Sequence, residues 1–210
     1  MSDTAHSKFM AAGLRLYPQL GYQKLSVRSL AAEAGLSAGM FHHLFASKEA
    51  FVAEMLWQYA AMAGLSTSVQ LPDEPFQRLR ETIRITAFFI RDHLAVAHRV
   101  LADSADGVAV VNEFMKSLLA QRMALVGELL QACARLDNSR PADTAQQLAY
   151  LNSAVTAPMI VGTRFQKMGL LPPPLDQRVD HVLSDEAILQ RIDWSIEVMF
   201  PRYRSAFGHH

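Results

Sequence analysis

The sequence has few cysteines, glycines and prolines and no excess charge, and each shortage excludes a class of protein. Cys133 is the only cysteine among 210 residues, so an internal disulfide framework is excluded. Glycine and proline number 10 and 9, too few for a collagen-like or low-complexity chain. Hydrophobic residues make up 50% of the chain and charged residues 19%, which excludes a disordered protein and indicates one or two folded domains.

The charge balance gives little indication of partners. The 20 Lys and Arg residues equal the 20 Asp and Glu residues, so the whole-chain charge favours neither a nucleic acid nor a membrane. Residues 1–48 are mildly basic, with five Lys or Arg residues against two acidic ones. The chain opens with MSDTAHSK, without a basic region leading into an apolar segment, so we expect no secretory signal and a cytoplasmic location.

Two stretches without charged residues are long enough to raise the question of a membrane span. They cover residues 55–72 and 144–163, and both contain several glutamine and serine side chains. Such side chains are too polar for hydrocarbon without partners. We therefore expect no membrane partner and interpret both stretches as helices that pack against other helices.

The spacing of apolar residues is helical almost throughout and predicts an all-α fold of about nine helices. Gly21 is expected to end the first helix in a left-handed conformation, with Pro18 distorting its last turn. A kink is expected at Pro158, and residues 170–183, with three consecutive prolines, are expected to be extended. The predicted helices cover residues 6–20, 27–34, 38–44, 48–65, 76–93, 95–105, 108–136, 141–169 and 185–200.

A polar segment predicts one domain boundary. Residues 66–74 are mostly polar and are followed by Pro75, which together read as a linker. The chain is therefore expected to contain an N-terminal domain, residues 1–65, and a helical C-terminal domain, residues 66–210.

Residues 26–44 have the spacing of a helix-turn-helix. Helices 27–34 and 38–44 are too short to be stable alone, and Gly35-Leu36-Ser37 fits the three-residue turn between them. Seven positions in one register carry the small, left-handed or apolar residue that the motif requires: Leu30, Ala31, Ala34, Gly35, Leu36, Phe41 and Leu44. The alternative is an ordinary tight helical hairpin.

The segment FMAAGLRLYPQLGYQKLSVRSLAAEAGLSAGMFHHLFASKE, residues 9–49, resembles the N-terminal domain of the tetracycline-repressor (TetR/AcrR) family of bacterial transcription regulators. The resemblance covers about 45 residues, and the rest of the chain matches that family only in helix count. It rests on Gly21-Tyr22, Ser26-Val27-Arg28, Ala34-Gly35-Leu36-Ser37 and Phe45-x-Ser47-Lys48-Glu49. It implies a homodimeric regulator, more often a repressor, that binds palindromic double-stranded DNA and is released by a small, largely apolar effector.

The resemblance also implies two groups of DNA contacts. Ser26, Arg28 and Lys48 would contact the phosphate backbone, and Arg28 also a base. The residues expected to face the major groove are Ser37, Gly39, Met40, His42 and His43. Gly39 permits close approach, Met40 offers an apolar contact for a thymine methyl, and either histidine can donate to guanine. Ser37 and Ser47 are alternatively only helix caps.

Two residues depart from the family pattern. Ala38 stands where the family usually has a basic residue, and Phe41 stands where it usually has a tyrosine; both usually reach phosphate. Affinity that is independent of sequence scales with the number of neutralised phosphates, so each copy is expected to hold DNA weakly. Two copies on two half-sites would compensate.

The C-terminal domain is rich in soft and aromatic side chains that suit an apolar pocket with a few polar anchors. The candidate ligand-binding residues are Trp57, Met62, Phe88, Phe89, His93, His98, Phe114, Met115, Met123 and Met159. Each is alternatively a core residue. His93 and His98 are five positions apart, about 140° around a helix, so they do not converge on a metal ion. We expect no metal and no cofactor.

Apolar stripes on the helices at 141–169 and 185–200 predict a dimer interface, although they would serve equally as core within one chain. The interface candidates are Leu148, Leu151, Val155, Ile188, Ile192, Ile196 and Met199.

Two rival functions belong to other classes. A helical enzyme would use the histidines with Asp92, Asp103 or Asp106, but the sequence has no nucleophile elbow, phosphate loop or dinucleotide fingerprint, so we expect no enzyme. The other rival is a DNA-bound helical adaptor that recruits a protein partner without a small ligand.

Overall fold

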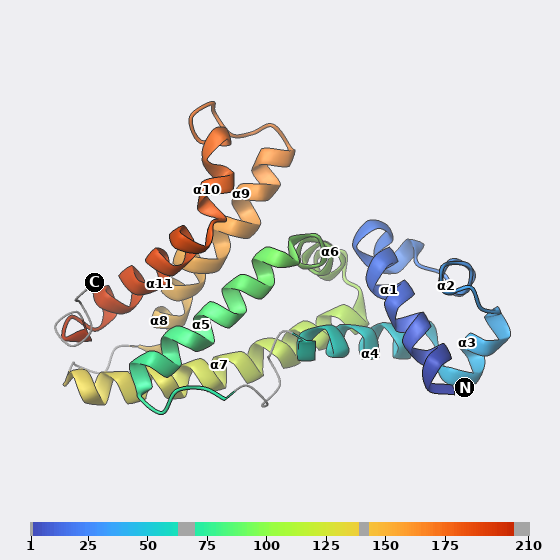
Figure 1. Cartoon of the computed structure of the whole chain (residues 1–210), viewed down its shortest axis with the longest axis horizontal. Coiled ribbons are helices and arrows are strands. Elements are labelled where there is room, and N and C mark those ends of the chain that lie inside the picture. Colours follow the sequence, from blue (N-terminus) through green and yellow to red (C-terminus); the bar gives the residue numbers. More distant parts are fainter. Residues whose placement is uncertain (1, 63–69, 139–142, 204–210) are drawn as a thin grey trace. The chain divides into compact units, whose positions relative to one another are not determined.

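The computed structural model describes residues 2–62, 70–138 and 143–203, and helices without any strand make up this part of the chain (Figure 1). The predicted all-α fold is therefore confirmed. In the same ranges no helix is both long and apolar enough to cross a lipid bilayer. The chain divides into two compact units: unit 1 is drawn from Met1–Thr67 and Ala95–Leu118, and unit 2 from Ser68–Leu94 and Leu119–His210.

Unit 1 contains the two short helices that the sequence predicted, at the predicted bounds. Its helices are α1 (Ser2–Lys24), α2 (Val27–Ala34), α3 (Ala38–Leu44), α4 (Lys48–Ala60), α6 (Leu94–Ala105) and the first part of α7 (Ala109–Asp137). The hydroxyls of Ser26, Ser37 and Ser47 accept hydrogen bonds from backbone amides three residues on, so all three cap helices. Gly35 ends α2 with φ 65° and ψ 37°, the left-handed conformation expected of it.

Four phenylalanine rings hold α1, α3 and α4 together. Phe9, Phe41, Phe45 and Phe51 are at most 3% exposed, and their ring centroids lie 4.9–6.0 Å apart. Offset and edge-to-face arrangements at such distances are favourable beyond the area that they bury. This cluster fixes α3, which is too short to be stable alone.

The end of α1 is completed by side chains from α6. Gly21 has φ 66° and ψ 175°, so α1 kinks there and continues to Lys24 rather than stopping at residue 20. The Tyr22 amide donates to Asp103 Oδ2 (2.8 Å), and Arg99 Nε donates to the Pro18 carbonyl (3.5 Å). An unbroken helix would pair that amide with that carbonyl. Asp103 and Arg99 therefore satisfy the two backbone groups that the kink separates.

Unit 2 is built from α5 (Pro75–Asp92), the remainder of α7, α8 (Thr144–Leu151), a π-helical turn η2 (Asn152–Thr156), α9 (Ala157–Lys167) and α11 (Asp185–Met199). Pro158 stands in the first turn of α9, directly after the π-helical turn. The expected irregularity at Pro158 is present, because proline cannot supply the amide that a continuous helix needs.

One local prediction is wrong. Residues 170–183 were expected to be extended, but the segment contains a 3-10 turn, η3 (Asp176–Arg178), and a short helix, α10 (Val179–Val182). Val179 is 4% exposed, so burial of an apolar side chain favours a helical turn after the three prolines. The predicted helix ends at residues 65 and 141 and part of the predicted linker lie outside the described residues.

The interface candidates are core residues of unit 2. Leu151, Val155, Ile188, Ile192 and Ile196 are at most 6% exposed, and Leu148 and Met199 pack against the same cluster. A second chain cannot reach side chains that this chain already covers. Five of the seven residues are therefore covered by this chain, Leu148 and Met199 are half-buried, and the dimer interface stays a prediction.

The kink predicts that two glycines differ in how well they tolerate alanine. At Gly21 an added Cβ would lie 2.8–2.9 Å from Arg99 and Asp103 atoms, whereas at Gly35 no atom lies within 4 Å. Gly21 also has a φ,ψ pair that is essentially restricted to glycine. We expect Gly35→Ala to lower the free energy of unfolding by about 1 kcal/mol and Gly21→Ala by about 2–3 kcal/mol in urea denaturation. Equal losses would contradict the packing at Gly21.

Candidate nucleic-acid interface

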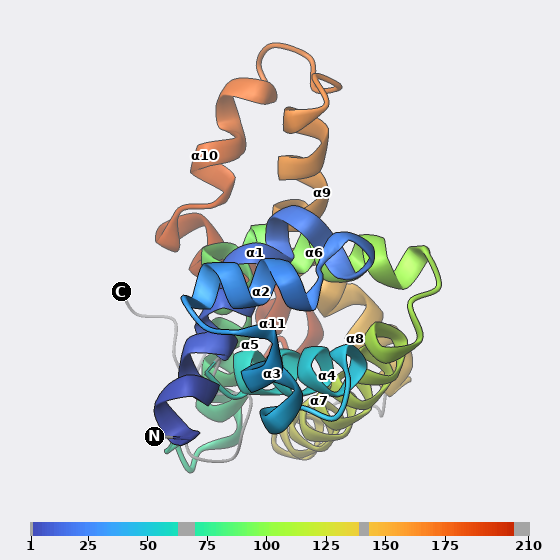
Figure 2. The ribbon, with the colours of Figure 1, turned by 90° about the vertical axis from the view of Figure 1, so that its right-hand side faces the viewer.

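The short helix α3 buries one side and exposes the other. Phe41 is completely buried and Leu44 is half-buried. The groove-facing candidates are all exposed: Ser37, Gly39, Met40, His42 and His43. Figure 2 shows α3 following α2 at an angle, as in a helix-turn-helix. The structure therefore brings the five candidates together on the outer side of one helix.

Ser26 and Arg28 lie exposed at the start of α2. Ser26 and Ser29 form a reciprocal capping box, in which each side chain accepts from the other residue's amide at 3.1 Å. Arg28 forms no ion pair with any described residue. Its guanidinium is thus available to an external anion, whereas Arg15 nearby in the chain is paired with Glu33 at 2.7 Å.

Lys48 is engaged within the protein. Its ammonium donates to the carbonyls of Tyr22 (3.0 Å) and Leu25 (3.2 Å) and lies 4.1 Å from the centroid of the Tyr22 ring. The Tyr22 hydroxyl donates to Glu49. Burial, together with this hydrogen bond, raises the pKa of Tyr22 to about 12, so the phenol stays a donor at neutral pH. Lys48 therefore ties the start of α4 to the end of α1, a role that the phosphate assignment from sequence did not include.

The two departures from the family pattern have clear structural consequences. Phe41 belongs to the aromatic cluster and cannot reach a phosphate. Ala38 is exposed at the first position of α3 but carries no charge or donor in its side chain. Phosphate contacts must come from other groups, and Lys24 and Arg28 are exposed cations on either side of Ser26.

Residues 9–55 match the family model described as bacterial regulatory proteins, tetR family. Residues 9–55 form a tetR-family DNA-binding domain. The matched range contains the exposed face of α3, the capping box and the Lys48 contacts. The tetR-family match therefore covers the helix-turn-helix of unit 1 and the start of α4. No curated protein has a significantly similar sequence.

Solved structures share the fold over most of the chain. A Clostridium perfringens protein, whose name proposes a role in regulating fatty acid metabolism, has a TM-score of 0.64 at 14% identity and covers 89% of this chain and 97% of that chain. FadR from Bacillus subtilis, solved in complex with stearoyl-CoA, has a TM-score of 0.60 at 12% identity with 97% and 99% covered. HlyIIR, a hemolysin II transcriptional regulator, has a TM-score of 0.59 at 18% identity with 88% and 99% covered.

The ten candidate ligand-binding residues are divided between the two units. Five lie in unit 1 (Trp57, Met62, His98, Phe114 and Met115) and five in unit 2 (Phe88, Phe89, His93, Met123 and Met159). Met159 is completely buried in the core of unit 2. Phe88 lies between Arg84 and Arg91, each within 5.2 Å of its ring. Trp57 packs edge-to-face against Phe114 at 5.1 Å, and Phe89 lies 4.4 Å from His93.

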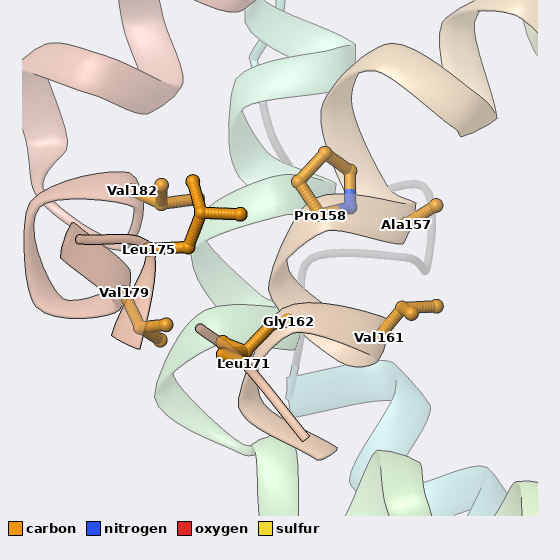
Figure 3. Close-up of a pocket in the computed structure, with 8 residues that line it drawn as sticks. All are labelled: Ala157, Pro158, Val161, Gly162, Leu171, Leu175, Val179 and Val182. Atoms are coloured by element: carbon orange, nitrogen blue, oxygen red, sulfur yellow. The ribbon is translucent and has the colours of Figure 1, made fainter. Parts of the chain in front are cut away.

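Unit 2 contains an apolar groove that the sequence did not reveal. It has a volume of about 400 Å³ and lies between α9 and residues 171–182. Figure 3 shows Leu175 and Val182 facing Pro158 across it. None of the ten candidates lines this groove, whose lining residues are Ala157, Pro158, Val161, Gly162, Leu171, Leu175, Val179 and Val182. The groove was not predicted because one of its walls includes the short helix α10, which was expected to be extended.

No group of three His, Cys, Asp or Glu side chains suited to a metal ion occurs among the residues that the structure describes. His93 Nδ1 lies 2.9 Å from the Phe89 carbonyl within α5.

Packing within the protein does not require a glycine at position 39, so substitution of Gly39 tests whether α3 approaches DNA closely there. A Cβ added there would meet only Ser37 Oγ, at 3.9 Å. Since glycine disfavours a helix interior, Gly39→Ala should leave the free energy of unfolding unchanged or raise it by about 0.5–1 kcal/mol. We expect its affinity for a selected DNA to fall by about tenfold, measured by fluorescence anisotropy, because a methyl group keeps the helix from the base edges. Unchanged affinity would exclude close approach at Gly39.

Lys48 and Arg28 are expected to respond differently to salt. Arg28→Ala should reduce the slope of log affinity against log salt concentration by about 1, because one phosphate contact is lost. Lys48→Met should lower affinity and cost about 1–3 kcal/mol of unfolding free energy, because two carbonyls lose their donor, while the slope stays unchanged. A reduced salt slope for Lys48→Met would instead show that Lys48 contacts a phosphate.

Proposed function

We propose that this protein is a ligand-responsive repressor that binds a palindromic operator as a homodimer. The observation that carries the proposal is α3 itself, which buries Phe41 in the protein and exposes the five groove-facing candidates. A helix anchored in this way presents its N-terminal residues to the major groove.

Each residue of the interface then has a task. Arg28 binds a phosphate, and Ser26 and Ser37 do so through amides and hydroxyls at helix N-termini. Met40 contacts a thymine methyl, and His42 or His43 donates to guanine. Lys48 acts as a positioning residue, since its ammonium holds α4 against the end of α1.

The dimer surface follows from the side chains that the core leaves exposed. On α9, Val161, Phe165 and Met168 are 43–56% exposed at spacings of four and three, and on α11 Trp194 and Val198 are 55% and 68% exposed four residues apart. Exposed apolar stripes of this kind mark interaction sites. We assign them to the contact with a second copy, together with the apolar groove, which shares Val161 with the α9 stripe.

The effector is proposed to bind unit 2 and to act through α6. FadR, which shares this fold, was solved with stearoyl-CoA, and this supports an effector with a long apolar part. The chain passes from α5 of unit 2 directly into α6, whose Arg99 and Asp103 hold the end of α1. An effector that binds more tightly when α5 is displaced would release these contacts. The two copies of α3 would then lose the spacing of about 34 Å, or a multiple of it, that two half-sites require.

Selection of bound DNA from a random pool tests the proposal. The full-length protein should select an inverted repeat and elute as a dimer in size-exclusion chromatography. Trp194→Asp should elute as a monomer and lose at least tenfold in affinity for the repeat, because a charge enters the apolar contact. Gln121→Asp adds the same charge at an exposed position of α7, outside the proposed contact, and is the control, expected to perturb less. Selection of unrelated sequences by the wild type would exclude the operator-binding function.

A further inference from the structure

Two half-buried arginines of unit 2, Arg122 and Arg191, form no ion pair with any residue that the structure describes. Arg191 donates to the Val182 carbonyl at 2.9 Å. Arg122 on α7 donates only a long hydrogen bond, from Nη2 to the Thr82 carbonyl of α5 at 3.5 Å. That carbonyl already accepts from Thr86 Oγ1 at 2.9 Å. No carboxylate in residues 2–62, 70–138 or 143–203 forms an ion pair with Arg122. Burial lowers the pKa of Arg122 to about 10, which still leaves the guanidinium charged at neutral pH.

Other arginines of this unit show how such a charge is usually satisfied. Arg80 forms a bidentate pair with Asp193 (2.6 and 2.9 Å), Arg84 pairs with Glu81, and Arg91 pairs with Asp92 and Asp185. These three arginines belong to α5, the helix to which Arg122 reaches. A desolvated cation without a counter-charge is unfavourable, and Arg122, unlike these three arginines, has no carboxylate beside it.

A second polar group at the same place also lacks a partner. Thr82 is 3% exposed, and its Oγ1 is buried without a hydrogen-bond partner. Buried hydroxyls are almost always hydrogen-bonded. Thr82 and Thr86 are one turn apart on α5, and Phe89 and His93 continue the same face at spacings of three and four. The Thr82 hydroxyl and the Arg122 guanidinium therefore lie at one residue of α5, and Phe89 and His93 lie further along the same side.

We propose that Arg122 and Thr82 bind the anionic group of the effector, a carboxylate or phosphate joined to an apolar chain. This inference rests on the proposed function, since it names the chemistry of the effector of unit 2. The guanidinium supplies two parallel donors that match an oxyanion, and the Thr82 hydroxyl supplies a third. An uncharged apolar molecule would leave both groups unsatisfied.

The test compares three probes of equal chain length with the full-length protein by isothermal titration, below their micelle concentrations. Dodecanoate and dodecyl phosphate carry the anionic group, and dodecanol does not. We expect at least one anion to bind about tenfold or more tightly than dodecanol, because only the anion satisfies Arg122. Whether dodecanoate or dodecyl phosphate binds more tightly identifies the group. Equal binding of dodecanol and both anions would overturn the inference.

Two variants separate an anion site from a structural role. Arg122→Met should remove the preference for anions while leaving dodecanol binding unchanged, and the matched control Arg84→Met should keep it. Thr82→Val should weaken anion binding several-fold yet leave the melting temperature without ligand unchanged or higher, because a buried hydroxyl without a partner is removed. A Thr82→Val protein that melts lower, or an Arg122→Met protein that keeps the preference, would contradict the proposal.

The selected DNA distinguishes this inference from the function on which it rests. Anion binding that also dissociates the DNA complex supports both. Anion binding that leaves the DNA complex intact supports the site and contradicts the effector role. Specific DNA binding by a protein that binds no probe overturns the anion site and leaves the operator-binding proposal standing.

Discussion

Burial of Phe41 is the constraint on which the DNA-binding end of the molecule depends. A helix of seven residues is not stable alone, and α3 exists because this ring packs among Phe9, Phe45 and Phe51. The same packing decides which residues face outward, since Phe41 is buried, Leu44 is half-buried and the other residues of α3 are exposed. The packing of Phe41 therefore both stabilises α3 and orients its exposed residues. Phenylalanine at position 41 suits this buried site but cannot supply the phosphate contact that a tyrosine hydroxyl would give.

What could be predicted from the sequence is what is local. The bounds of α2 and α3, the caps at Ser37 and Ser47 and the left-handed Gly35 each depend on residues a few positions apart, and all were predicted correctly. The kink at Gly21 was foreseen only as an end of the helix. Its continuation needs Arg99 and Asp103, about 80 residues away, and no local pattern indicates that a distant side chain will complete a broken helix.

In the candidate site too, features set by local spacing were predictable and features set by contacts between helices were not. Exposure of the α3 residues follows from helical periodicity around Phe41, so it was predictable. The engagement of Lys48 by two backbone carbonyls was not, because it depends on how α4 meets the end of α1. Likewise, the apolar stripes of α8 and α11 identified helices with a buried side, but periodicity alone does not say whether the same chain or another copy covers it. The exposed Trp194 and Val198 mark the remaining side.

The π-helical turn before Pro158 has a consequence for how α8 and α9 present their surfaces. A π-helical turn holds one residue more than an α-helical turn, so it offsets everything that follows by about 100° around the axis. Val155 before the proline and Met159 after it both reach the core across this offset. If Asn152–Thr156 formed an α-helical turn instead, α9 would be rotated by about 100° and Met159 would point away from the core. The π-helical turn thus determines which side chains of α9 face the core and which face outward.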